Sequence, residues 1–251
     1  MDRGGWHDLV DVIRRLQAPD GCPWDRSQTA ATLRPYLLEE CCETLASIDA
    51  NEGVDEELGD LLFVLLSIAE LRMRTGGKGA DAVAAGAAAK MRERHPDLFE
   101  GTGPTSDGSM ASWEARKARQ DRSALDGVPK TLPGLLRAHR VGEKVAARGF
   151  DWPDPGAVRA KLDEELAEMD AALAAGNSLE IEEELGDVLF TLAQVARHAG
   201  VSGEDALRGA LAKFEGRFRI AEADIRRDAY EGREPDVLDT YWRRAKATWR
   251  A

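Results

Sequence analysis

Apolar residues recur at intervals of three and four along most of the chain, which is the spacing of one face of an α-helix. One such stripe consists of Leu37, Leu38, Cys41, Leu45 and Ile48, and a second consists of Leu162, Leu166, Met169 and Leu173. The alternation typical of β-strands is missing, and the helix-favouring residues Ala, Leu, Glu and Arg dominate these segments. The pattern therefore predicts an all-α protein.

Proline and glycine divide this pattern into separate helices. Pro35 and Pro155 suit the first turn of a helix, where the missing N–H group costs nothing. Gly53, residues 76–77 and residues 176–177 mark helix ends. Each half of the chain is therefore expected to hold four or five helices, with short loops joining antiparallel neighbours in a bundle.

Several landmarks occur twice, in the same order and at a near-constant offset. Glu-Glu-x-x-Glu and Glu-Leu-Gly-Asp both recur, and each pair is followed by Lys-x-x-x-Arg and Trp-x-x-x-Lys. The last two motifs are formed in the first half by Lys90 and Arg94 and by Trp113 and Lys117, and in the second half by Lys213 and Arg217 and by Trp242 and Lys246. We therefore predict two related helix-bundle domains, residues 1–122 and 134–251. A linker at residues 123–133, which contains an Asp-Gly pair and two prolines, is expected to join them.

The charge balance narrows the classes of partner. The chain has 34 Lys and Arg residues against 46 Asp and Glu residues, a formal net charge of -12. Such a surface repels phosphodiester backbones and anionic membranes, so we expect neither nucleic acid nor membrane as a partner. No apolar run approaches the ~20 residues that cross a bilayer. Three cysteines, two of them adjacent, do not make a disulfide framework, and together these features predict a cytoplasmic protein.

The duplicated acidic motifs place several carboxylates on one helix face, because residues i, i+1 and i+4 fall within an arc of about 100°. The first motif supplies Glu39, Glu40 and Glu43 in the first half and Glu164, Glu165 and Glu168 in the second. The next helix of each half adds a pair of acids one turn apart, Glu57 with Asp60 and Glu184 with Asp187. If the two helices pack antiparallel, up to five carboxylates converge in each half.

Oxygen-only ligand sets suit hard cations, so these clusters predict a Mg²⁺ site, with Mn²⁺ as the alternative ion. No histidine belongs to either cluster, which argues against the Glu-x-x-His pattern of di-iron bundles. A plain solvated helix face would show the same acidic motif. However, like charges three and four residues apart repel, and the unfavourable pattern occurs in both halves. The second pair of each half also leads directly into an apolar run, where an unpaired charge would be costly.

The basic and aromatic motifs each leave two interpretations open. The Lys-x-x-x-Arg pairs lie on one helix face, which suits either capture of an anion or ion pairs with the carboxylates of the bundle. The tryptophans either pin a helix to the core or stack on a nucleotide base, with the following lysine reaching a phosphate. A Walker-type loop is absent from the sequence, so phosphate capture would depend on a metal ion.

The ordered series of four motifs, present twice, resembles the two-domain MazG family of all-alpha nucleoside triphosphate pyrophosphohydrolases. Residues 21–25 (Gly-Cys-Pro-Trp-Asp), 94–96 (Arg-His-Pro) and 149–152 (Gly-Phe-Asp-Trp) also match stretches typical of the family. The resemblance covers nearly the whole chain. It implies hydrolysis of nucleoside triphosphates between the α- and β-phosphates, broad specificity and a homodimer.

The resemblance also implies roles for individual residues. Magnesium would be held by Glu165, Glu168, Glu184 and Asp187 in the second half, and by Glu40, Glu43, Glu57 and Asp60 in the first. The leading Glu164 or Glu39 would orient or deprotonate the attacking water. The triphosphate would be handled by Lys213, Arg217, Trp242 and Lys246 and by their first-half counterparts Lys90, Arg94, Trp113 and Lys117.

In two-domain members of the family the C-terminal half tends to carry the activity, yet here both halves keep the full set of motifs. The division of labour between the halves is therefore open. One alternative is a non-catalytic helical module that senses nucleotides or binds a partner, at least in the first half. Another is a narrower enzyme that acts on dUTP or phosphoribosyl-ATP. The sequence does not reveal a preference for base or sugar.

Overall fold

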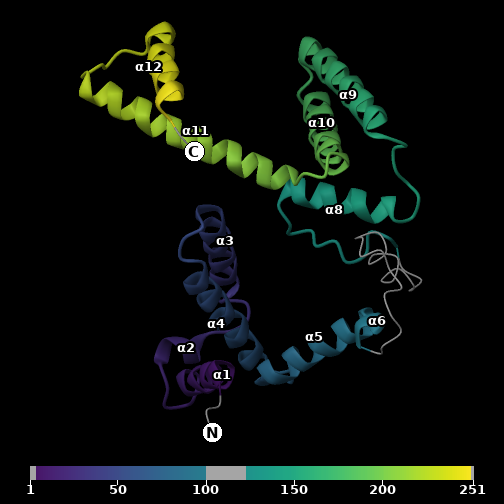
Figure 1. Ribbon diagram of the computed structural model, residues 1–251, viewed down its shortest axis with the longest axis vertical. Coiled ribbons are helices and arrows are strands. Elements are labelled where there is room, and N and C mark those ends of the chain that lie inside the picture. Colours follow the sequence, from purple (N-terminus) through teal and green to yellow (C-terminus); the bar gives the residue numbers. More distant parts are fainter. Residues whose placement is uncertain (1–3, 100–122, 250–251) are drawn as a thin grey trace. The chain divides into compact units, whose positions relative to one another are not determined.

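The computed structural model describes residues 4–99 and 123–249, which belong to two separate units (Figure 1). Every regular element in these two ranges is a helix, so the all-α prediction is confirmed. The order of the long helices in the first unit recurs in the second, as expected for a tandem repeat of helical domains. Trp113 and Lys117 lie outside the described residues.

The first unit is built around a pair of long helices, α3 and α4. Its helices are α1 (Gly4–Leu16), α2 (Pro23–Ser27), α3 (Arg34–Ala50), α4 (Val54–Met73), α5 (Ala80–Arg94) and α6 (Pro96–Phe99). Pro35 lies in the first turn of α3, as predicted. Asn51 and Gly53 both adopt left-handed backbone angles, with φ of 53° and 71°, and this tight reversal lays α4 back along α3.

The buried core of the first unit lies where α1 crosses α4. Val10 and Ile13 of α1 are 2% and 1% exposed and pack against Leu66 and Ala69 of α4. Ala80, the first residue of α5, completes this cluster. The core therefore fixes α1 and the start of α5 to the second half of α4, and it leaves the first half of α4 to face α3.

The second unit repeats this plan and adds a longer arm. Its helices are α8 (Gly134–Ala146), α9 (Pro155–Ala175), α10 (Ser178–His198), α11 (Gly203–Arg227) and α12 (Pro235–Thr248). Asp154 caps α9 by accepting a hydrogen bond of 2.9 Å from the backbone N–H of Ala157. Gly176, with φ of 68°, ends α9, and Asn177 caps α10. The short connection lays α10 back along α9.

A second, smaller core joins α12 to the C-terminal part of α11. Ala221 of α11 packs with Tyr241 and Ala245 of α12, and the partly buried Ile225 and Tyr230 surround them. Within the described part of the chain, none of the helices is long and apolar enough to cross a membrane.

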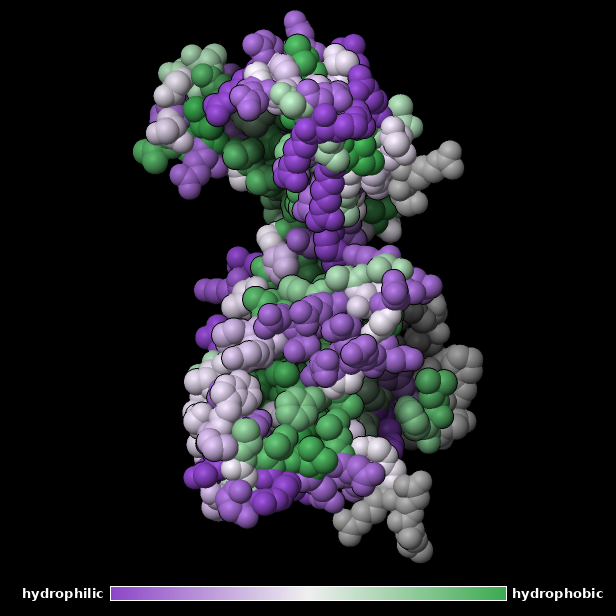
Figure 2. All heavy atoms as spheres, turned by 90° about the vertical axis from the view of Figure 1, so that its left-hand side faces the viewer, coloured by the Kyte–Doolittle hydropathy of each residue, from purple (hydrophilic) through white to green (hydrophobic). Residues whose placement is uncertain are grey.

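The apolar stripes identified in the sequence are only partly covered within each unit. Leu162 is 6% exposed, whereas Leu38 is 67%, Ile48 is 53% and Leu173 is 52% exposed. Figure 2 shows apolar side chains gathered on one face of the first unit, with polar side chains around them. Exposed apolar surface of this extent is typical of a contact surface.

A buried carboxylate ties together the three helices of the first core. Glu70 of α4 is 7% exposed; its Oε2 accepts a hydrogen bond of 2.8 Å from Arg14 Nε, and its Oε1 accepts one of 2.8 Å from the backbone N–H of Ala80. Burial alone would raise the pKa of Glu70, but these hydrogen bonds and the charge of Arg14 outweigh it and hold that pKa below its usual value.

Replacing Glu70 by Ala leaves the buried Ala80 N–H without its acceptor, and we expect the free energy of unfolding to fall by about 2 kcal/mol. The exposed Glu93→Ala on α5 is the matched control and should change it by less than about 0.5 kcal/mol. Because the folded-state pKa of Glu70 is lowered, its contribution is present above its unfolded pKa of about 4.3 and is lost as the pH falls through the folded value. Urea unfolding of the full chain measures both; equal midpoints for the two variants would contradict the assignment.

Candidate metal centre

Three carboxylates meet between α9 and α10, and we call them the C-terminal carboxylate group. Glu165 extends from α9, and Glu184 and Asp187 extend from α10, one turn apart. One oxygen atom of each lies within 4.8 Å of the other two. Glu165 is only 6% exposed, Glu184 is half-buried and Asp187 is exposed. The group therefore reaches from the helix interface to the surface, open to a ligand on one side.

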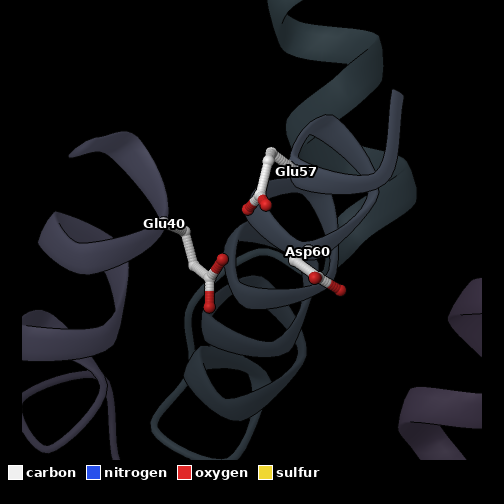
Figure 3. Close-up of side chains that lie close together, drawn as sticks. All are labelled: Glu40, Glu57 and Asp60. Carbon is white, nitrogen blue, oxygen red and sulfur yellow. The ribbon is translucent and has the colours of Figure 1, made fainter. Parts of the chain in front are cut away.

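The first unit repeats the arrangement between α3 and α4, and we call it the N-terminal carboxylate group. Figure 3 shows Glu40 of α3 opposite Glu57 and Asp60 of α4, with all three carboxylates close together. Their ligand oxygens also lie within 4.8 Å of one another. Among the described residues, Glu40 Oε2 is one of the few buried side-chain atoms without a hydrogen-bond partner. A buried, unpartnered carboxylate oxygen is costly unless a cation completes its surroundings.

Burial and like charge act together on both groups. Burial and the charges of Glu168 and Asp187 raise the pKa of Glu184. In the first unit, burial and the charges of Glu43 and Asp60 raise the pKa of Glu57. Glu40 has a raised pKa for the same reasons. Each group thus concentrates negative charge that a divalent cation would offset, and its oxygen-only ligands fit Mg²⁺ or Mn²⁺.

The remaining predicted acids lie around these groups. Glu43 and Glu168 are exposed and stand outside the 4.8 Å sets, although their charges act on Glu57 and Glu184. Glu39 and Glu164, the candidate bases, are also exposed. Three of the four predicted metal ligands in each half therefore converge, and the fourth stays near enough to act through its charge.

Lys161 contacts the C-terminal carboxylate group, although the sequence analysis did not single it out. Its Nζ lies 2.7 Å from Glu164 Oε1 and 3.0 Å from Glu165 Oε1, and both acids raise the pKa of Lys161. The spacing of three and four residues on one helix was the signal that could have found it. The offset that relates Glu39 to Glu164 pairs Lys161 with Tyr36, so the first unit has no cation at this position.

The candidate triphosphate residues of the second half gather on α11 and α12. The ring of Trp242 lies 5.1 Å from that of Phe214, and Lys246 Nζ lies 5.7 Å from the Trp242 ring. The guanidinium of Arg217 lies 5.3 Å from the ring of Trp249, and Lys213 is exposed. The contact between Trp242 and Phe214 joins α12 to α11, so this tryptophan packs one helix against the other, and it remains half-buried.

The corresponding basic pair of the first half lies on α5. Lys90 is exposed and Arg94 is half-buried at the last residue of that helix. Both side chains are thus carried by the helix that follows α4, as Lys213 and Arg217 are carried by the helix that follows α10.

Comparison with known proteins gives a consistent result. Residues 28–99 and 154–219 match the MazG nucleotide pyrophosphohydrolase domain, one match in each half. The chain is 37% identical over 252 residues to the nucleoside triphosphate pyrophosphohydrolase of Escherichia coli (strain K12), covering 95% of each chain. It is 36% identical over 249 residues to the nucleoside triphosphate pyrophosphohydrolase/pyrophosphatase MazG of Thermotoga maritima, covering 96% of this chain and 95% of that protein.

Replacing Asp187 by Asn removes one of the repelling charges. We expect this change to raise the stability of the metal-free chain by a few tenths of a kcal/mol. It should also reduce the stabilisation by MgCl₂, which we expect to be about 2.7 kcal/mol for one intact site at a concentration 100 times Kd. Thermal unfolding with and without MgCl₂ measures both effects. Both chains in this test carry Asp60→Asn, which weakens the first site. If Asp187→Asn leaves the stabilisation by MgCl₂ unchanged in that background, metal binding at the C-terminal carboxylate group is refuted.

Proposed function

The chain belongs to the MazG nucleotide pyrophosphohydrolase family, and on that premise we propose that it hydrolyses nucleoside triphosphates to nucleoside monophosphates and pyrophosphate in a Mg²⁺-dependent reaction. The observation that carries the proposal is the meeting of three carboxylates within 4.8 Å, once in each unit. The relatives from Escherichia coli and Thermotoga maritima, named for this activity, align over nearly their whole lengths.

The C-terminal carboxylate group would hold Mg²⁺ through Glu165, Glu184 and Asp187, with Glu168 close by. Mg²⁺ bound there would offset the charge of the triphosphate and make the attacking water more acidic. The exposed Glu164 stands next to Glu165 on α9, and we assign it the role of accepting the proton from that water. The water oxygen bonds to the α-phosphorus while the bond to the bridging oxygen breaks, and pyrophosphate leaves. Glu39 would take the same part in the first unit.

We assign binding of the triphosphate and base to the cations and aromatic rings of α11 and α12. Lys213, Arg217 and Lys246 supply positive charge in a chain with a net charge of -12, which suits the leaving pyrophosphate. Trp242, half-buried against Phe214, offers a ring surface for a base. In the first half, Lys90 and Arg94 would serve the triphosphate.

We further propose that the protein forms a homodimer. Leu189 of α10 is 46% exposed, and Leu211 and Phe214 of α11 are 51% and 55% exposed, so two neighbouring helices present apolar surface. A second copy would cover this surface, and it would bring the cations and rings of one chain toward the carboxylates of the other. The two-fold pairing of identical faces is the commonest form of assembly.

We propose that the substrate range is broad. The carboxylate groups of the two units have different neighbours, because Lys161 contacts the group of the second unit and Tyr36 takes its place in the first. Two sites that catalyse the same reaction would therefore accept different nucleotides. A cytoplasmic location fits this role, since nucleoside triphosphates are held there.

Replacing Asp187 and Asp60 together by Ala removes one ligand from each carboxylate group and should lower pyrophosphate release more than about 100-fold, because a direct metal ligand matters at least as much as the partners that orient one. Asp170→Ala is the matched control, since Asp170 is an exposed acid on α9 outside the carboxylate group. Pyrophosphate and orthophosphate are measured separately with MgCl₂ and each nucleoside triphosphate. Turnover at the wild-type rate in the chain that carries both Asp187→Ala and Asp60→Ala would refute the assignment.

The homodimer is tested by placing a charge on the apolar face. Leu211→Glu puts a carboxylate in the proposed interface, and burying it unpaired would cost enough to shift the chain to a monomer. Arg219→Glu, a charge reversal on a side chain of α11 that is 79% exposed, should leave the dimer intact. Light scattering after size-exclusion chromatography gives the mass. A monomeric wild-type chain would overturn the proposal.

A further inference from the structure

A pocket opens beside the N-terminal carboxylate group. Its volume is about 160 Å³, and its apolar wall includes Trp24, Phe63 and Val64. Glu40 and Asp60, two members of the carboxylate group, also line it. A ligand held by its phosphates at the carboxylate group would therefore have its other end next to this pocket.

Two aromatic rings border the pocket. Trp24 and Tyr36 meet edge to face, with ring centroids 5.6 Å apart and planes at 85°. They are 48% and 39% exposed, so ring surface stays available to a planar ligand. Gln28 Nε2 donates a hydrogen bond of 3.0 Å to the backbone carbonyl of Trp24, which holds that segment in place. Flat rings of this kind stack on nucleobases.

A buried hydroxyl group in the pocket lacks a partner. Ser67 of α4 is 4% exposed, and its Oγ makes no hydrogen bond within the described ranges of the chain. Gln17 Nε2 donates to the backbone carbonyl of Ser67 at 3.3 Å, so amide and hydroxyl groups lie side by side at this end of the pocket. Leaving a buried polar atom unpaired is costly, and a ligand with polar atoms on its edge would satisfy it.

The second unit fills the corresponding place with its own side chain. The offset that relates Asp60 to Asp187 pairs Ser67 with Gln194, which is completely buried. Gln194 Nε2 donates to the backbone carbonyl of Ala138 at 2.8 Å, and its Oε1 accepts from Arg197 Nε at 2.8 Å. The polar atoms are satisfied there without a ligand, so the two units present different surroundings beside the same carboxylate group.

We propose that the pocket of the first unit binds the base of a pyrimidine nucleotide, with Trp24 stacking on the ring and Ser67 bonding its polar edge. This assignment rests on the proposed function, because it takes the phosphates to lie at the N-terminal carboxylate group. A single ring is favoured by volume, since a cavity of about 150 Å³ accommodates benzene. Trp24 and Gln17 lie outside the segment that matches the family domain, which begins at residue 28.

The test uses the full chain with Asp187→Asn, which weakens metal binding at the C-terminal carboxylate group. The ligands are the α,β-imido analogues of UTP and ATP, in which an N–H group replaces the oxygen between the α- and β-phosphorus atoms. Calorimetry in the presence of MgCl₂ should show tighter binding of the UTP analogue. Trp24→Ala should weaken it by about tenfold or more through loss of stacking. Trp152→Ala is the matched control and should leave it unchanged, since Trp152 lies 128 residues after Trp24, close to the offset of 127 that relates Asp60 to Asp187.

Two substitutions at Ser67 separate the hydroxyl from the space. Ser67→Gln introduces the residue of the second unit, fills the pocket and should abolish Trp24-dependent binding. Ser67→Ala keeps the space and should weaken binding about threefold through the lost hydrogen bond. Circular dichroism checks that each variant is folded. If Ser67→Gln does not fold, the binding measured for Ser67→Ala decides the test.

Unchanged binding of the UTP analogue in Trp24→Ala, or equally tight Trp24-dependent binding of the ATP analogue, would overturn the pyrimidine pocket. Pyrophosphate release by the wild-type chain is measured separately and reports on the proposed function alone. If the wild-type chain releases pyrophosphate but binding does not depend on Trp24, only the pocket is refuted. If the wild-type chain releases no pyrophosphate from any nucleoside triphosphate, the proposed function is refuted.

Discussion

Each carboxylate group depends on a pair of packed helices that hold like charges close together. Glu165 is almost fully buried beside Glu184 and Asp187, and burial and neighbouring charges raise the pKa of Glu184. An isolated helix would relieve such repulsion by letting its side chains move apart. Here α10 lies back along α9 across a short connection, and the packing of the two helices holds the carboxylates in place. A divalent cation bound between the carboxylates would offset this repulsion.

The two units place this arrangement in different surroundings. In the second unit Lys161 binds Glu165, and Gln194 fills the neighbouring space with satisfied hydrogen bonds. In the first unit Tyr36 stands where Lys161 would be, and Ser67 leaves a pocket with an unpartnered hydroxyl. Duplication of one helical plan has thus kept the charged centre and changed what lies next to it. The two halves therefore differ in the side chains beside the carboxylate groups, although their motifs are the same.

The helices α11 and α12 carry the other part of the proposed chemistry. Their own core and the contact between Phe214 and Trp242 make them a distinct pair, joined to α8 and α10 through the start of α11. Exposed apolar residues continue along α10 and α11, where a second copy would bury them. A helical protein whose apolar helix faces are only partly covered by its own chain is suited to assembly with a second copy, which would cover them.

The sequence by itself determined the helices, the repeat and the acidic motifs, because these depend on spacing along the chain. Pro35, Pro155 and the turn at residues 176–177 stand where the structure begins and ends helices. An arc of about 100° could not decide which acids of a motif meet. Glu165 faces its partners while Glu168 of the same arc stays exposed, because the rotation of α9 against α10 is set by packing along the whole interface. The tertiary structure alone brought Trp24, Tyr36 and Ser67 to one pocket, since the three come from separate helices and no spacing relates them.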